Sequence, residues 1–131
     1  MAAIRSHDTA PEVYLRKLLY HRGIRYRKNE RSVFGCPDIW IPKCRTAIFV
    51  NGCYWHRHEG CRLAYTPKSR IEFWQQKFDT NVQRDMRVRD TLEAQGVRCL
   101  VVWECQIRKM RKDTETEQAE LDRLIGLLNT S

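Results

Sequence analysis

The densest group of chemically active side chains lies in residues 49–61, which read FVNGCYWHRHEGC. Cys53, His56, His58 and Cys61 fall within its last nine residues, and Cys105 is a further candidate far along the chain. Thiolate sulfur and imidazole nitrogen are ligands that zinc prefers. The sequence has five candidate ligands for an ion that is coordinated by four, so we expect a structural zinc site and one side chain that does not bind zinc and can have another role. The alternative is a chance grouping of buried cysteines and surface histidines.

A single acidic residue, Asp38, stands in an apolar setting after Pro37. A carboxylate there could hold a hard cation such as Mg²⁺, which takes oxygen ligands and polarises a phosphate. A turn or capping aspartate is the alternative, and it is favoured unless other polar groups converge on Asp38. Glu12, His56 and Asp85 are the candidates, because each is expected at the end or on the polar face of a neighbouring element.

Residue types suited to nucleic acid lie close to these groups. Tyr54 and Trp55 are adjacent in the metal-type loop, and an exposed aromatic wedge can enter between base steps. The alternative is that both pack on the core. Lys77, Asn81 and Arg84 share one face of a predicted helix, and lysine and asparagine can read base edges. A solvated charged face would show the same pattern.

The charge distribution favours a polyanionic partner. The chain has 131 residues, the length of a single domain, so we interpret residues 1–131 as one domain. Residues 113–131 carry five acidic groups and one basic group, whereas residues 1–112 carry 23 basic and 11 acidic groups. This excess of basic groups in residues 1–112 favours binding to nucleic acid, and a solvated basic surface is the alternative.

The sequence contains neither an apolar stretch of membrane-spanning length nor a secretory signal, so we expect a cytoplasmic protein without membrane contact. In a reducing compartment, metal binding explains six cysteines better than three disulfides do.

The hydrophobic pattern predicts the elements that must position these groups. Capping boxes at Thr9-x-x-Glu12 and Ser69-x-x-Glu72 are expected to open two helices. The apolar run at residues 97–103 is expected to form a central strand covered on both faces. The expected fold is α/β, a mixed sheet flanked by helices. Its order is a helix over residues 9–23, strands over 24–27, 38–41 and 46–50, a helix over 69–94, a strand over 97–103 and a helix over 114–129.

Several short motifs follow one another between Met1 and about residue 108, and the most specific is Gly52-Cys53-Tyr54-Trp55-His56. Together they resemble the very-short-patch repair (Vsr) endonuclease family over most of the chain. The other motifs are Met1-x-x-Ile4, Asp8-Thr9-Ala10-x-Glu12, Pro37-Asp38, Phe49-Val50, His58-x2-Cys61, Phe73-Trp74-x2-Lys77, Asn81-Val82-x-Arg84-Asp85 and Val101-Val102-Trp103-Glu104-Cys105.

This resemblance implies a restriction-endonuclease-like core with a zinc-stapled loop. It implies a Mg²⁺-dependent nick in duplex DNA on the 5′ side of the thymine of a T:G mismatch, which arises when 5-methylcytosine deaminates. Mismatch-repair proteins are possible partners, and a monomer is expected because a single-strand nick needs one active site. A nuclease of the same core with another DNA target, or a zinc-stabilised DNA-binding module without catalysis, are the competing hypotheses.

The resemblance also assigns roles to residues. Asp38 would bind Mg²⁺ with the backbone carbonyl of Val50, and His56 would be the catalytic histidine, positioned by Glu12, with Asp85 as a further acid. The structural zinc would be held by Cys53, His58, Cys61 and Cys105, with Tyr54 and Trp55 wedged beside the mismatch and Lys77 and Asn81 facing the bases.

Two departures from the family pattern stand out. Where the family often has a histidine before the Gly-Cys pair, this chain has Asn51, which cannot act as a base. Relatives carry a basic N-terminal extension that reaches DNA, whereas this sequence begins at Met1, so we expect part of that contact to be missing.

Overall fold

The structure is a computed structural model that describes residues 9–129; the expected loss of N-terminal DNA contacts therefore falls outside the described residues. The elements are α1 (Ala10–His21), β1 (Arg27–Lys28), β2 (Ile39–Ile41), the short 3₁₀ helix η1 (Pro42–Cys44), β3 (Thr46–Asn51), α2 (Ile71–Ala94), β4 (Arg98–Trp103), α3 (Glu104–Lys112) and α4 (Thr114–Asn129).

The four strands form a mixed sheet in the order β1-β2-β3-β4, which confirms the predicted α/β class. β1 and β2, and then β2 and β3, pair antiparallel, whereas β3 and β4 pair parallel. The expectation of a central strand at residues 97–103 is wrong: β4 is the last strand of this sheet in the described part of the chain. Its apolar run includes Val101, which is 37% exposed.

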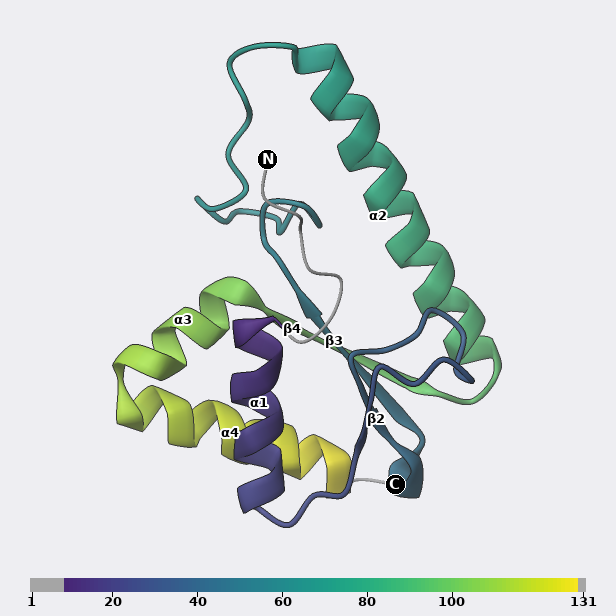
Figure 1. The fold of residues 1–131 in the computed structure, drawn as a ribbon, viewed down its shortest axis with the longest axis vertical. Helices are drawn as coiled ribbons and strands as arrows, with labels where there is room; N and C mark the ends of the chain where they lie inside the picture. Colours follow the sequence, from purple (N-terminus) through teal and green to yellow (C-terminus); the bar gives the residue numbers. More distant parts are fainter. Residues whose placement is uncertain (1–8, 130–131) are drawn as a thin grey trace.

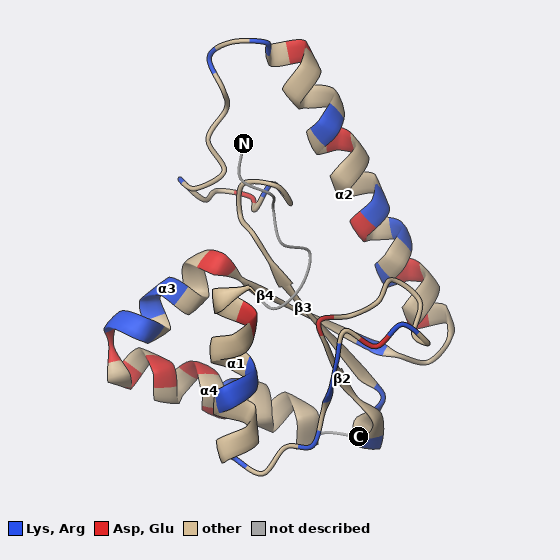
Figure 2. Ribbon diagram, in the orientation of Figure 1, with Lys and Arg blue, Asp and Glu red and all other residues tan. Residues whose placement is uncertain are grey.

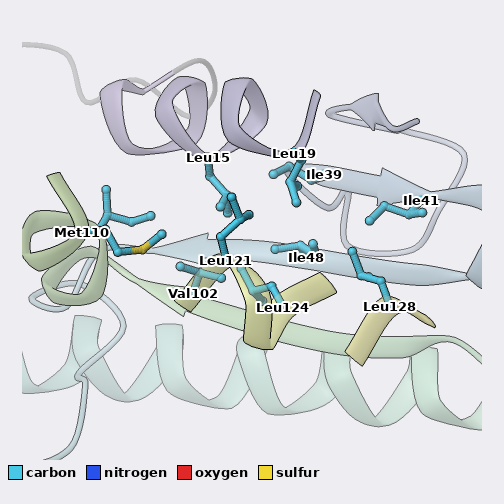
Figure 3. Close-up of a cluster of buried hydrophobic side chains, with 11 residues drawn as sticks. Leu15, Leu19, Ile39, Ile41, Ile48, Val102, Met110, Leu121, Leu124 and Leu128 are labelled. Carbon is cyan, nitrogen blue, oxygen red and sulfur yellow. The ribbon is translucent and has the colours of Figure 1, made fainter. Parts of the chain in front are cut away.

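Helices cover the two faces of the sheet unequally (Figure 1). On one face, α1, α3 and α4 enclose the larger core, in which sheet residues such as Ile48 and Val102 pack against helix residues such as Leu15 and Leu121 (Figure 3). On the other face, only the C-terminal part of α2 packs closely on the sheet, through Leu92. The N-terminal part of α2 is therefore left to pack against the loop that follows β3.

The helix α3 is missing from the predicted order, because it follows β4 with no breaking residue between them. It buries Ile107 and Met110, three positions apart, which is too short a pattern to stand out. The two expected capping boxes do not form: the N-cap residues of α1 and α2 are Thr9 and Arg70, and neither makes a side-chain cap hydrogen bond.

Charges are distributed unevenly over the layers (Figure 2). The acidic residues of α4 lie on the face of the sheet that is opposite α2, whereas α2 carries both basic and acidic residues along its length. Within residues 9–129, the structure has no helix that is long and apolar enough to cross a membrane.

Candidate active site

A cleft of about 1070 Å³ opens between α2, the ends of β3 and β4, and the start of α1. It is bordered by Val101, which explains why an apolar strand residue remains exposed there. Tyr54 and Lys77 are not among the residues that line it. The predicted site residues that the cleft brings together are Glu12, Asp38, Val50, Trp55, His56, Asn81 and Asp85, with His58 also on its wall.

Asp38 is held against the neighbouring strand. It directly precedes β2, and its Oδ2 accepts a 2.7 Å hydrogen bond from the backbone N–H of Val50 in β3. Burial raises the pKa of Asp38 to about 7; the Val50 hydrogen bond opposes this rise, and the carboxyl of Glu12, which is itself buried, adds to it. Half-buried Asp38 and buried Glu12 place carboxyl oxygens side by side, and such oxygen atoms are ligands suited to a hard cation.

His56 forms a close pair with Asp85. Its Nδ1 lies 2.6 Å from Oδ2 of Asp85, which projects from the middle of α2. A carboxylate only accepts hydrogen bonds, so Nδ1 carries the proton and Nε2 of the neutral ring is left free to accept one. The carboxylate that contacts Nδ1 of His56 is therefore that of Asp85. Glu12 is instead hydrogen-bonded to Asp38. The predicted action of Glu12 on His56 stays a prediction.

Three cysteines and one histidine gather beside this pair. The ligand atoms of Cys53, His58, Cys61 and Cys105 all lie within 4.8 Å of one another. His58 Nδ1 is 3.6 Å from Sγ of Cys53 and 3.4 Å from Sγ of Cys105. In a tetrahedral site with Zn–S bonds of about 2.3 Å, neighbouring sulfurs are about 3.8 Å apart, so this cluster could hold a metal ion. His56 lies outside it.

The surroundings of the cluster favour a bound cation. Burial raises the pKa of the Cys53 thiol to about 12, so ionising this thiol calls for a compensating positive charge. The backbone N–H of Cys105, in the first turn of α3, lies 3.4 Å from the Cys53 sulfur. Trp103 stacks on the ring of His58, with the centroids 4.1 Å apart. The strand–helix junction, which the sequence does not signal, therefore fixes both Cys105 and the ring of His58.

The predicted wedge residues pack against α2. Tyr54 and Trp55 are both half-buried, and their rings lie 5.2 Å and 6.4 Å from that of Phe78. Trp55 also contacts Trp74, at 5.8 Å. The sequence does not single out Trp74 as part of the site, because its spacing from Phe78 is that of ordinary helix packing.

The two predicted base readers differ in position. Asn81 lines the cleft, and its side-chain amide donates a 3.2 Å hydrogen bond to the carbonyl of Trp55. Lys77, one turn earlier on α2, is exposed beyond the cleft, with its Nζ 5.2 Å from the ring of Phe73. Asn81 therefore fixes the loop in this structure, while Lys77 is free to reach a ligand.

Comparison with known proteins connects this geometry to an activity. The family model described as DNA mismatch endonuclease Vsr matches residues 1–62. The type II nicking enzyme V.NmeAIP of Neisseria meningitidis serogroup A is 42% identical over 108 residues, which are 82% of this chain and 76% of that protein. The type II nicking enzyme V.XorIIP of Xanthomonas oryzae pv. oryzae is 43% identical over 107 residues, 82% of this chain and 78% of that protein. The DNA mismatch endonuclease Vsr of Escherichia coli K12 is 41% identical over 120 residues, 92% of this chain and 76% of that protein. This chain is a DNA endonuclease, and it belongs to the Vsr family.

Proposed function

We propose that this endonuclease nicks duplex DNA on the 5′ side of the thymine of a T:G mismatch, by Mg²⁺-dependent phosphodiester hydrolysis. The observation that carries the proposal is the convergence of Asp38 and the His56–Asp85 pair in one cleft beside Trp55. The name of the E. coli relative, a DNA mismatch endonuclease, supports the choice of substrate. One such site makes one nick, so the chain would act as a monomer.

Asp38 and the carbonyl of Val50 are the groups that would hold Mg²⁺. They fit this ion because they offer oxygen ligands, and because burial and the nearby Glu12 carboxyl raise the pKa of Asp38, so a bound cation would favour its ionised form. When bound, Mg²⁺ would neutralise the scissile phosphate and the charge that builds up in the transition state. Buried Glu12, beside Asp38, would add negative charge that holds the cation.

His56 would take the proton from the attacking water. Its Nε2 is the free acceptor, since Nδ1 faces Asp85. The Asp85 carboxylate would hold the ring in this orientation and stabilise the imidazolium that forms, and general-base catalysis of this kind typically contributes about 10²- to 10⁴-fold in rate. Asn51, on the wall of the cleft, cannot replace His56 as a base.

The cluster of Cys53, His58, Cys61 and Cys105 would hold a structural zinc. With four protein ligands, the ion would have no open position for water, so it would stabilise the fold rather than catalyse. The imidazole of His58 would be occupied by the metal, which leaves His56 as the histidine able to accept a proton.

A second candidate function is nicking linked to restriction, at a different DNA sequence. Two of the relatives named above are type II nicking enzymes, which favours this alternative. The two functions share a catalytic site and differ in the DNA that reaches it, so only a comparison of mismatched with paired duplexes separates them.

Catalysis itself is tested by replacing Asp38 with alanine. We expect Asp38→Ala to keep its affinity for mismatched duplex and to lose Mg²⁺-dependent nicking. A wild-type protein that binds mismatched duplexes of varied flanking sequence and never cuts them would instead support a DNA-binding module without catalysis.

A further inference from the structure

The two histidines of the HRH segment serve different sites, although they are only two positions apart. In an extended chain, residues i and i+2 point to the same side. Here His56 pairs with Asp85 in the cleft, whereas His58 joins Cys53 and Cys105 in the cysteine cluster. The segment that joins the two histidines is therefore not extended.

The two histidines are directed apart by a turn that ends at Arg57. Residues 53–57 form one helical turn, in which the N–H of His56 bonds to the carbonyl of Gly52 at 3.1 Å and that of His58 to the carbonyl of Cys53 at 3.0 Å. Arg57 has a φ of +51°, in the left-handed region. A six-to-one bond closed by a left-handed residue is a common helix end, and glycine usually occupies that position. Arginine there has a steric cost that glycine lacks.

The guanidinium of Arg57 makes contacts that offset this cost. It donates hydrogen bonds to the carbonyls of Tyr54 at 3.2 Å, Ala64 at 3.0 Å and Tyr65 at 3.2 Å. It also lies 4.0 Å from the ring centroid of buried Phe78 on α2. One side chain thus joins the helical turn, residues 64–65 and α2, and lysine cannot reproduce this planar set of donors.

We propose that Arg57 is a positioning residue, whose guanidinium locks the turn that directs His56 into the cleft and His58 into the cysteine cluster. The carbonyls it binds belong to the loop that carries both histidines, so its loss removes the links between the turn and residues 64–65 and one of the contacts of this loop with α2. The effect on nicking rests on the proposed function, whereas the effect on the loop does not.

The test compares zinc-loaded wild type with Arg57→Lys, which keeps the charge, and Arg57→Gly, which accommodates the left-handed backbone but lacks the guanidinium. Arg62→Lys is the matched control, because Arg62 is an exposed arginine of the same loop. Zinc content, hydrogen exchange of residues 53–66, affinity for mismatched duplex, and the single-turnover nicking rate at saturating DNA are measured for each protein.

We expect both Arg57 variants to retain one zinc per chain, to exchange faster over residues 53–66, and to nick about 10- to 100-fold more slowly at saturating DNA. Their affinity for DNA should change far less than this rate, which a general loss of fold would not produce. Arg62→Lys should match the wild type in every measurement.

Exchange and nicking at wild-type levels in Arg57→Gly would overturn the proposal, because that variant lacks the guanidinium. If Arg57→Lys loses its zinc, the exchange and nicking of Arg57→Gly alone decide whether Arg57 is a positioning residue. If the wild type does not nick any duplex, the proposed function fails, and the exchange of residues 53–66 still decides the role of Arg57.

Discussion

Nδ1 of His56 lies 2.6 Å from Oδ2 of Asp85, although the two residues are 29 positions apart and belong to the loop after β3 and to α2. This contact joins the loop to the long helix at the edge of the cleft. It also assigns the proton to Nδ1 and leaves Nε2 for the reaction. The orientation of the proposed base therefore depends on a carboxylate that lies on another element.

Replacing Asp85 with asparagine tests this dependence. An amide can donate to Nδ1 and so favour the wrong tautomer, and it cannot stabilise an imidazolium. We expect the single-turnover nicking rate of Asp85→Asn to fall about 10²-fold or more, with DNA affinity nearly unchanged. Asp79→Asn, an exposed acid on the same helix, should nick normally. Equal rates for wild type and Asp85→Asn would remove Asp85 from the mechanism.

Asp38→Asn should stabilise the Mg²⁺-free protein at alkaline pH. The pKa of Asp38 is raised from an ordinary 3.8 to about 7 in the folded chain, so its contribution to stability is full below pH 3.8 and is lost as pH rises towards 7. By linkage, the variant should exceed wild type by about 1–3 kcal/mol in free energy of unfolding at pH 8. Urea unfolding measures this difference, which should shrink as pH falls from 8 to 5.

Magnesium provides the control for that experiment. A cation that binds the folded state raises stability by mass action, so Mg²⁺ should stabilise wild type at pH 8 and have little effect on Asp38→Asn. A wild type that is as stable at pH 8 as at pH 5 would contradict the raised pKa of Asp38.

Cys105→Ser should lose most of its zinc. As a zinc ligand, Cys105 would fix the start of α3 to the loop after β3, so we also expect a loss of about 2–4 kcal/mol in stability. Metal analysis and thermal unfolding measure the two effects. Cys44→Ser is the matched control, because Cys44 is a half-buried thiol in η1 that contacts Thr46 instead of the cluster. Full zinc content in Cys105→Ser would exclude it as a ligand.

Trp55→Ala should weaken binding to mismatched duplex more than binding to paired duplex. Stacking of an aromatic ring on a base is worth about 1–3 kcal/mol, so we expect roughly 5- to 150-fold weaker binding. Fluorescence anisotropy at fixed salt measures both affinities. Tyr20→Ala, which removes an exposed aromatic ring from α1, is the control. An equal loss of affinity for the two duplexes would mean that Trp55 does not contribute to discrimination between mismatched and paired DNA.

Much of the fold could be predicted, because α1, α2, α4 and the strands β2 and β3 follow clear hydrophobic patterns, whereas the strand expected over residues 24–27 is the shorter β1 at Arg27–Lys28. The stripe of α4 is one example, since Leu121, Leu124 and Leu128 are all buried. The position of β4 could not be predicted, because an apolar strand that borders a cleft has the same composition as a central strand. Val101 is the residue that shows the difference.

The residue types of the candidate site could be predicted from the sequence, but the contacts between them could not. The five candidate zinc ligands in the sequence leave open which one does not join the others, and in the structure His56 lies outside the cysteine cluster, on a turn that ends at Arg57. A positive φ at an arginine has no sequence signal of its own. Likewise, the choice of Asp85 over Glu12 as the partner at His56 Nδ1 depends on how α2 crosses the sheet.

The most direct test of the central proposal is a strand-resolved gel of end-labelled duplexes, one with a T:G mismatch in a CT(A/T)GG-type context and one fully paired, with and without Mg²⁺. We predict a single Mg²⁺-dependent nick on the 5′ side of the mispaired thymine and no cut in the paired duplex. Equal cutting of both duplexes would contradict mismatch recognition and favour nicking linked to restriction.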